Sequence, residues 1–283
     1  MKFQTITIEN KGLFRKFLAE YPIEAHEQNF TNLFSWRKSD RHEWAEYKGH
    51  LVVSFMEGSR KFYPPIGPNP HEIMKEMLNE FPGMSFRRVD KKIAEKLRDE
   101  FKIESDRANW DYVYSLDELK SLGGAKYARE RNFVRKFQTY NPKICRLDSN
   151  SEEEFAELLD RWCDIKKCRD DAHMKAEVNA NREALRNFKS LEIFGVCIRV
   201  NNRIAGYAIA DELNSDTCVE HFEKADTNYA GIYQFILHEL AKSVPPHLKF
   251  INREQDLGIP GLRKSKMAYN PIRFVEKYIV SKK

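Results

Sequence analysis

Apolar residues recur along the chain with two different spacings. Residues 9–21 place leucine and phenylalanine at the spacing of one helix face, and the aromatic run 30–36 predicts a second helix. The segment 44–55 then alternates apolar and polar side chains on either side of a Lys48-Gly49 turn, which predicts a β-hairpin. The chain therefore begins with helices and passes into a sheet.

The rest of the first 115 residues or so continues this change between strand and helix. Strands are expected at 62–67, 85–89 and 110–114, and amphipathic helices at 71–81 and 91–100. This order predicts a mixed sheet flanked by helices.

A second series of helices and strands follows residue 115. A helical segment interrupted at Gly123-Gly124 comes first, and Ser151 with Glu154 predicts a capping box at the next helix. The later helices are expected at 152–167, 179–190 and 231–243, and the strands at 193–200, 204–213, 217–222 and 248–251. We expect an α/β (α+β) fold with two domains, residues 1–120 and residues 121–283, each a mixed sheet with helices.

Composition changes this picture little. The 283 residues are 41% hydrophobic and 32% charged with a net charge of +5, which alone indicates neither a nucleic-acid-binding nor a membrane protein. The five cysteines show no CxxC pair and no zinc-like spacing, which favours reduced thiols and no metal site. No apolar run is long enough to span a bilayer, and no signal peptide is evident. We expect a cytoplasmic protein, compatible with peripheral contact with a membrane.

The segment KYARERNFVRK, residues 126–136, concentrates positive charge. It contains five basic residues and only one acidic residue, and Arg131 and Arg135 would be neighbours on the surface of a helix. Guanidinium groups match phosphate oxygens, so this face suits a phosphate-bearing ligand, with Asn132 as a further polar contact. The alternative is a solvated helix face.

The segment VEHFEK places three charged residues and a histidine in one strand. Regular alternation would put Glu220 and Phe222 on one face and His221 and Glu223 on the other. Glu223 falls at the end of the strand, where ligands of α/β proteins usually bind. The alternative is a strand edge decorated with charge.

The segment after this strand predicts a helix that begins near Gly231. Its first residues, Tyr229 to Gly231, precede backbone amides that can bind a phosphate or a carboxylate.

The loop NREQDLGIPGLRKSKMAYNP, residues 252–271, carries acids and amides first and basic residues afterwards. It is either a structural Ω-like loop or a substrate-binding loop in which Glu254 and Asp256 recognise a cationic amine. The sequence from Gly258 to Gly261 is not a dinucleotide-binding motif, because we expect no helix behind it.

These segments, together with FTNLFSW near the start, resemble a bacterial and archaeal family of unknown function. That family is related to the C-terminal catalytic domain of phosphatidylglycerol lysyltransferases, and the resemblance covers nearly the whole chain. It implies two tandem domains like those of the Gcn5-related N-acyltransferases (GNAT-like), an arrangement shared with Fem-type aminoacyltransferases.

The resemblance also implies transfer of an acyl or aminoacyl group to an amine or hydroxyl, with acyl-CoA or aminoacyl-tRNA as co-substrate. The sequence departs from these relatives in two ways, which bear on the acceptor and on the co-substrate. We expect no membrane-embedded N-terminal region of the kind that the lysyltransferases carry, which puts a lipid acceptor in doubt. The turn at residues 228–233 matches the acyl-CoA-binding loop only at Gly231, which puts the usual CoA pose in doubt.

We expect Glu223 to act as general base and Lys224 to stabilise charge. The residues expected to bind donor or substrate lie in the three segments above: Lys126, Arg129, Arg131, Asn132, Arg135, Glu220, His221, Tyr229, Gly231, Tyr233, Gln234, Asn252, Arg253, Glu254, Gln255, Asp256, Gly258, Arg263, Lys264 and Lys266. The alternative is a non-catalytic module on the same fold that binds an amine, an amino acid or tRNA.

Overall fold

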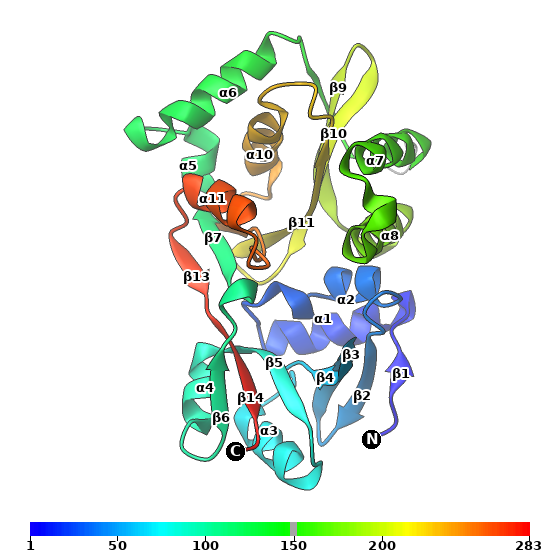
Figure 1. The fold of residues 1–283 in the computed structure, drawn as a ribbon, viewed down its shortest axis with the longest axis vertical. Coiled ribbons are helices and arrows are strands. Elements are labelled where there is room, and N and C mark those ends of the chain that lie inside the picture. Colours follow the sequence, from blue (N-terminus) through cyan, green and yellow to red (C-terminus); the bar gives the residue numbers. More distant parts are fainter. Residues whose placement is uncertain (148–151) are drawn as a thin grey trace. The chain divides into compact units, whose positions relative to one another are not determined.

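The computed structural model describes residues 1–147 and 152–283, which form two compact units (Figure 1). Unit 1 consists of Met1–Tyr112, Glu254–Ser265 and Arg273–Lys283, and unit 2 of Val113–Arg253 and Lys266–Ile272. Each unit is therefore assembled from segments that are not contiguous in the sequence.

The sheet of unit 1 has seven strands in the order β1-β2-β3-β4-β5-β14-β6. The strands are β1 (Gln4–Thr5), β2 (Glu43–Tyr47), β3 (His50–Glu57), β4 (Ser59–Phe62), β5 (Ser85–Asp90), β6 (Lys102–Ser105) and β14 (Lys277–Ser281). All neighbours are antiparallel except β4 and β5, which are parallel and pair only at Phe62 and Phe86. The last strand of the chain thus lies between two strands from its first half.

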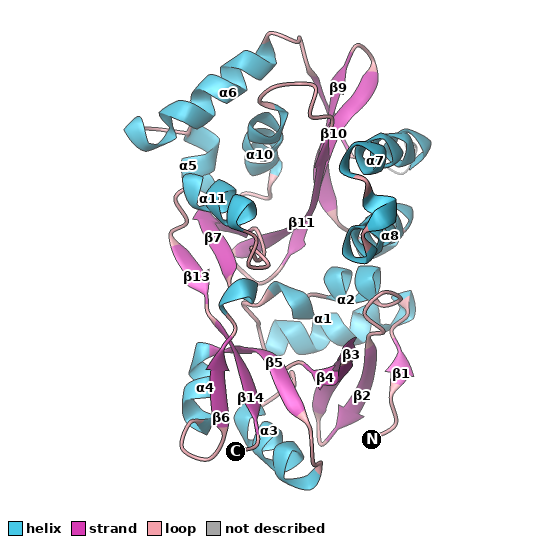
Figure 2. Ribbon diagram, viewed as in Figure 1, coloured by secondary structure: helices cyan, strands magenta, loops and turns pink. Residues whose placement is uncertain are grey.

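Four α-helices accompany this sheet (Figure 2). They are α1 (Lys11–Glu20), α2 (Phe30–Trp36), α3 (Pro70–Glu80) and α4 (Lys91–Leu97). Met77 of α3 belongs to the same buried cluster as Phe86 and Leu97, whereas Phe14 of α1 packs on the rings of Phe30 and Trp44. Burial of these apolar side chains stabilises the unit.

The second sheet also has seven strands, in the order β13-β7-β12-β11-β10-β9-β8. The strands are β7 (Asp111–Ser115), β8 (Lys143–Arg146), β9 (Phe194–Val200), β10 (Arg203–Glu212), β11 (Thr217–Ala225), β12 (Phe250–Asn252) and β13 (Arg273–Val275). β11 and β12 are parallel, β7 is antiparallel to β12, β10 is antiparallel to both β9 and β11, and β8 is antiparallel to β9. Asn201 and Asn202 both have positive φ in the β9–β10 turn, as a tight hairpin requires.

Helices cover both faces of the sheet in unit 2. They are α5 (Leu116–Ser121), α6 (Ala128–Gln138), α7 (Glu152–Lys166), α8 (Ala172–Arg186), α9 (Phe188–Leu191) and α10 (Ile232–Ser243). α7 packs on β10 and β11, and α10 packs on β9, β10, α5 and α6, so α7 and α10 lie on opposite sides of the strands (Figure 1).

The expected fold class is confirmed: both sheets are mixed, mainly antiparallel and flanked by helices. Some expectations were wrong. The strand expected at 62–67 is β4, which ends at Phe62, and residues 63–65 form no strand. A helix, α11 (Pro260–Ala268), does follow Gly258. Pro260 opens it, at the position where the fixed φ of proline favours a helix. The predicted cap Ser151 lies outside the described residues. Among the residues that are described, no helix has both the length and the apolar character of a membrane span.

Candidate functional site

The two parallel strands of unit 2 separate at a cluster of charged side chains. β11 and β12 pair as far as Val219 and Asn252, where β12 ends and β11 continues. Arg253 is the first residue beyond β12. Its guanidinium lies 2.5 Å from Oε2 of Glu220 and 2.9 Å from Oε2 of Glu223. Two carboxylates on one strand therefore share one guanidinium from the next.

A β-bulge places both carboxylates on the same face of β11. The register with β10 shifts between Phe222 and Glu220, so His221 is the extra residue of the bulge. The bulge reverses the alternation, and Arg253 contacts Glu220 and Glu223 together. This corrects the expectation that Glu223 faces away from Glu220.

The three charged side chains are nearly removed from water. The exposed fractions are 5% for Glu220, 14% for Glu223 and 13% for Arg253. Burial raises the pKa of Glu223 to about 8, and the charge of Glu220 acts in the same direction. Burial would lower the pKa of Arg253, but the two carboxylates raise it above its ordinary value. We infer that the carboxylate pair holds a proton near neutral pH beside a charged guanidinium.

Each carboxylate of the pair keeps one open acceptor atom. Oε1 of Glu220 and Oε1 of Glu223 are buried and have no hydrogen-bond partner among the described residues. Leaving a buried carboxylate oxygen without a donor costs free energy, and a bound ligand that supplies a donor would remove this cost.

Aromatic rings and one ammonium group surround this cluster. The guanidinium carbon of Arg253 lies 5.4 Å from the ring centre of Tyr269 and 6.0 Å from that of Tyr114. Lys266 donates a hydrogen bond from Nζ to the carbonyl of Arg253. Burial, followed by the charge of Glu223, raises the pKa of Tyr233 to about 12. The phenol of Tyr233 therefore remains a hydrogen-bond donor near Glu223.

Lys224 lies on the other face of β11. It donates to Oε1 of Glu177 on α8, and its Nζ is 4.0 Å from the ring centre of Trp162 on α7. The residue is 3% exposed. Lys224 thus links two helices to the strand. Its charge lowers the pKa of Glu223, but its ion pair is with Glu177 and not with a carboxylate of the Glu220–Arg253–Glu223 cluster.

The candidate residues in the segment 126–136 fall into two groups, those whose side chains bind the end of α5 and those that are exposed. Lys126 contacts both carboxylate oxygens of Glu118 at 2.7 and 2.8 Å, and Arg131 donates to the carbonyls of Leu122 and Gly124. These two side chains hold the end of α5. The remaining candidates are exposed on α6: Arg129, Asn132 and Arg135.

The turn before α10 is packed against α6. Gly231 has a φ of +91°, and a Cβ there would lie 2.2 Å from the carbonyl oxygen of Phe133. The ring of Tyr229 contacts those of Phe137 and Tyr140. The expected helix start is confirmed, and Gly231 permits close approach of two backbones. Gln234, one turn into α10, is half-buried.

In unit 1, both carboxylate oxygens of Asp256 accept hydrogen bonds from neighbouring residues. Its carboxylate accepts hydrogen bonds from Arg107, from Tyr112, twice from Arg263 and from the backbone N–H of Gly258. Burial would raise its pKa, but the hydrogen bonds from Arg263 and Tyr112 hold the pKa well below its ordinary value. This carboxylate stabilises its own loop, which agrees with the interpretation of residues 252–271 as a structural loop and not with a substrate-binding role of Asp256.

The other candidates of residues 252–271 have different surroundings. Asn252 is fully buried at the end of β12 in unit 2. In unit 1, Oε1 of Glu254 lies 3.9 Å from Nε2 of His26, and Oε1 of Gln255 is buried with no hydrogen-bond partner among the described residues. Lys264 is exposed.

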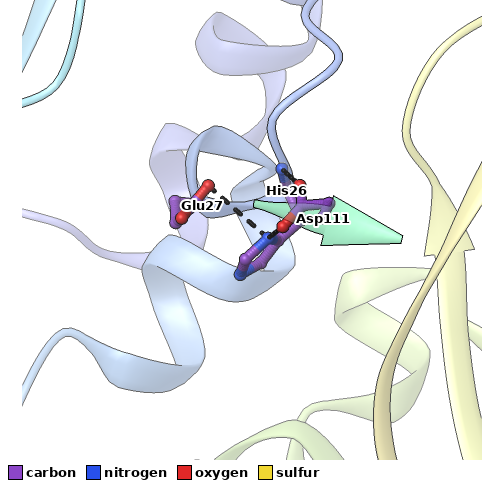
Figure 3. A group of neighbouring side chains, drawn as sticks. All are labelled: His26, Glu27 and Asp111. Carbon is purple, nitrogen blue, oxygen red and sulfur yellow. Dashed lines mark hydrogen bonds and ion pairs between the residues drawn. The ribbon is translucent and has the colours of Figure 1, made fainter. Parts of the chain in front are cut away.

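A further charged cluster in unit 1 was not expected from the sequence (Figure 3). His26, Glu27 and Asp111 are buried, and their potential ligand atoms lie within 4.8 Å of one another. Nζ of Lys277 lies 2.6 Å from Oε2 of Glu27 and 2.6 Å from Oδ1 of Asp111. The donor set could hold a metal ion, but here the ammonium group of Lys277 pairs with both carboxylates. Its members are up to 251 residues apart, so no local spacing signals it.

Solved structures share the fold of this chain. A conserved protein of unknown function from Bacteroides thetaiotaomicron superposes with a TM-score of 0.93 at 27% identity, over 100% of both chains. L-PGS from Bacillus licheniformis gives a TM-score of 0.68 at 12% identity, over 96% of this chain and 91% of that one. FemX gives 0.53 at 12% identity, over 100% and 98%. The Fem-like tandem arrangement expected from the resemblance is confirmed.

The chain belongs to the family of phosphatidylglycerol lysyltransferase C-terminal domains, whose sequence profile matches residues 18–281. It is also 21% identical, over 171 residues, to an uncharacterized protein of Mycoplasmoides gallisepticum. That match covers 60% of this chain and 55% of the relative, so the chain spans about half the length of this curated relative. The family supports an acyl- or aminoacyltransferase class.

Proposed function

We propose that this chain is an acyl- or aminoacyltransferase whose reaction takes place at Glu220, Glu223 and Arg253. Family membership supports the class of reaction. The observation that carries the proposal is the pair of buried carboxylates that share one guanidinium where β11 and β12 separate. The open oxygen of each carboxylate suits an N–H or O–H group of the acceptor.

Glu223 is the proton acceptor of this proposal. A pKa of about 8 lies close to the working pH of most enzymes, where a carboxylate can take up and release a proton efficiently. The nitrogen or oxygen of the acceptor attacks the acyl carbon, and its proton passes to Glu223. The bond from the acyl carbon to the donor oxygen or sulfur breaks, and the leaving group takes up the proton that Glu223 accepted. Arg253 stabilises the negative charge that develops on the carbonyl oxygen.

The α6 surface favours aminoacyl-tRNA over acyl-CoA as the donor. The turn before α10, where an acyl-CoA transferase would hold pyrophosphate, is in backbone contact with α6 at Gly231. Arg129, Asn132 and Arg135 are exposed on α6 and suit the phosphates at the end of a tRNA.

Replacement of Glu223 by glutamine tests this proposal. Glu223→Gln keeps the size and polarity of the side chain but cannot accept a proton. With charged tRNAs as donors and a panel of amines and alcohols as acceptors, we expect turnover to fall about 100-fold or more. In the unaltered chain, kcat/KM should rise with pH to a plateau, with an apparent pKa near 8.

Glu177→Gln is the matched control for this experiment. Glu177 is also a partly buried carboxylate beside β11, but it pairs with Lys224 on the opposite face. We expect the turnover of Glu177→Gln to stay within a few-fold of that of the unaltered chain. Equal turnover in Glu223→Gln would reject Glu223 as base. Binding of an amine or amino acid in a thermal-shift assay, without transfer from any donor, would instead support the non-catalytic module.

A further inference from the structure

Two cysteines that are far apart in the sequence lie opposite each other on neighbouring strands. Cys145 on β8 is in register with Cys197 on β9 in an antiparallel pair. The thiol of Cys145 lies 3.2 Å from the carbonyl oxygen of Cys197 and donates to it. The scattered cysteines of the sequence therefore include a direct cross-strand pair, and both are thiols in the structure.

The register brings both residues within reach of a disulfide bond. Residues directly opposite each other in antiparallel strands have Cα atoms about 4.5 or 5.5 Å apart. Disulfides span Cα separations of roughly 4.4–6.8 Å, so no strand has to move for the bond to form. A disulfide that is partly exposed, as this one would be at Cys145, is easier to reduce than a fully buried structural disulfide.

We propose that Cys145 and Cys197 form a reversible oxidation site that converts to a disulfide in the presence of a peroxide. β8 is the edge strand of the sheet, and Cys145 is partly exposed there, whereas Cys197 is 1% exposed. An oxidant from solvent therefore meets Cys145 first, and Cys197 is the thiol that resolves the product.

The reaction needs one peroxide for each disulfide. The Cys145 thiolate attacks one peroxide oxygen, the O–O bond breaks, hydroxide leaves and Cys145 becomes a sulfenic acid. The sulfur of Cys197 then loses its proton and displaces hydroxide from that sulfenic acid. In total, two thiols and one peroxide give one disulfide and two waters.

The surroundings of Cys197 set the pH dependence of the second step. The neighbouring thiol of Cys145, followed by burial, raises the pKa of Cys197, and Arg199 on the same strand opposes this. Glu154 of α7 pairs with Arg199 and acts in the raising direction. Disulfide formation should therefore be faster at alkaline than at neutral pH, because the thiolate is the reacting species.

The bond would fasten the edge of the sheet. β8 is held on one side only, by β9, and it follows α6 directly in the chain. A cross-link from residue 145 to residue 197 closes a long loop of the unfolded chain, and such a closure stabilises the folded state.

Peptide mapping after mild oxidation tests the proposal. The whole chain is treated with hydrogen peroxide, remaining thiols are alkylated, and the protein is cut with trypsin. Cleavage at lysine and arginine separates residues 144–146 from residues 190–199. We expect these two peptides to appear as one disulfide-linked species that dithiothreitol releases. We also expect oxidation to raise Tm by roughly 2–8 °C.

Two single variants and a second pair of neighbouring thiols serve as controls. Cys145→Ser should abolish the linked peptide and the rise in Tm, and Cys218→Ser, at a fully buried cysteine elsewhere in the sheet, should leave both unchanged. Cys163 and Cys168 are also close enough to share a hydrogen bond, and trypsin separates them as well. Linkage of that pair alone, or overoxidation of Cys145 without a link to Cys197, would overturn the proposal.

Discussion

At the scale of single residues, the buried carboxylates of this chain differ in how completely their oxygens are used. Asp256 accepts hydrogen bonds from three side chains and one backbone amide, so it has no capacity left for a substrate. Glu220 and Glu223 share Arg253 and each keep one buried oxygen without a donor. Burial without full hydrogen bonding is costly, and it is the reason for assigning chemistry to this pair rather than to Asp256.

A prediction at this scale concerns Lys277, whose ammonium group lies between Glu27 and Asp111. Lys277→Ala removes the ammonium group that two buried carboxylates share and leaves Arg88 beside Glu27 and His26 beside Asp111. We expect a loss of about 3–5 kcal/mol in the free energy of unfolding. Because the ligand atoms of His26, Glu27 and Asp111 lie within 4.8 Å, Zn²⁺ should restore part of this loss. Urea unfolding with and without zinc measures both effects.

Lys92→Ala, at an exposed lysine of the same unit, is the control for this variant. It should change the free energy of unfolding by no more than about 0.5 kcal/mol and show no response to zinc. Equal stability of Lys277→Ala and Lys92→Ala would contradict the role of the buried ammonium.

At the scale of elements, the site depends on small departures from regular structure. The bulge at His221 turns Glu220 and Glu223 to one face, and the early end of β12 frees Arg253 to reach both. The positive φ of Gly231 allows α10 to begin in contact with α6. Each departure involves one residue, yet together they determine which side chains meet.

A pair of glycine substitutions tests the last of these contacts. In Gly231→Ala the new methyl group would lie 2.2 Å from the carbonyl oxygen of Phe133, and the backbone would keep an unfavourable φ. We expect a loss of roughly 2 kcal/mol or more in the free energy of unfolding. Gly12→Ala, in the first turn of α1 with open space around it, should instead add up to about 0.5–1 kcal/mol. Thermal and urea unfolding of both variants distinguish packing from a general effect of alanine.

At the scale of the whole molecule, the chain crosses between its two units several times. Unit 1 ends its first segment at Tyr112 but takes up two later segments, one of which supplies β14. The boundary between residues 120 and 121, expected from the order of helices and strands, divides the chain once. A single boundary in the sequence therefore does not separate the two compact units, because each unit is built from more than one segment.

This connectivity predicts the behaviour of a fragment. A fragment of residues 1–120 lacks β14, so β5 and β6 lose the strand between them, and Glu27 and Asp111 lose Lys277. We expect it to show no cooperative unfolding in urea by circular dichroism. The same fragment joined to residues 271–283 by a flexible linker should recover a cooperative transition. A cooperative transition in the shorter fragment would show that β14 is dispensable.

Local sequence patterns were sufficient for most of the secondary structure and for the class of fold. The aromatic run 30–36 forms α2, the Lys48-Gly49 turn joins β2 to β3, and residues 217–222 lie in β11. These features depend on neighbours along the chain, whose spacing is visible in the sequence. The resemblance to the lysyltransferase family was also carried by contiguous motifs, and the family match confirms it.

The site could be located only in part from the sequence. Glu220, Glu223 and Arg253 were among the candidates, but regular alternation placed Glu220 and Glu223 on opposite faces of the strand, which is wrong. A bulge is one extra residue without a clear sequence signal, and it reverses every face beyond it. Lys224 was grouped with Glu223 because both lie at the end of the strand, but adjacent strand residues face opposite ways, and Lys224 pairs with Glu177.

The sequence by itself determined which segments become helices and strands, and to which family the chain belongs, because both depend on order along the chain. Only the tertiary structure decided which charges meet. Lys277 reaches Glu27 across 250 residues, and Cys197 faces Cys145 across 52. Such contacts follow from strand order and register, which the whole core fixes by burying apolar faces together, and no short segment contains that information.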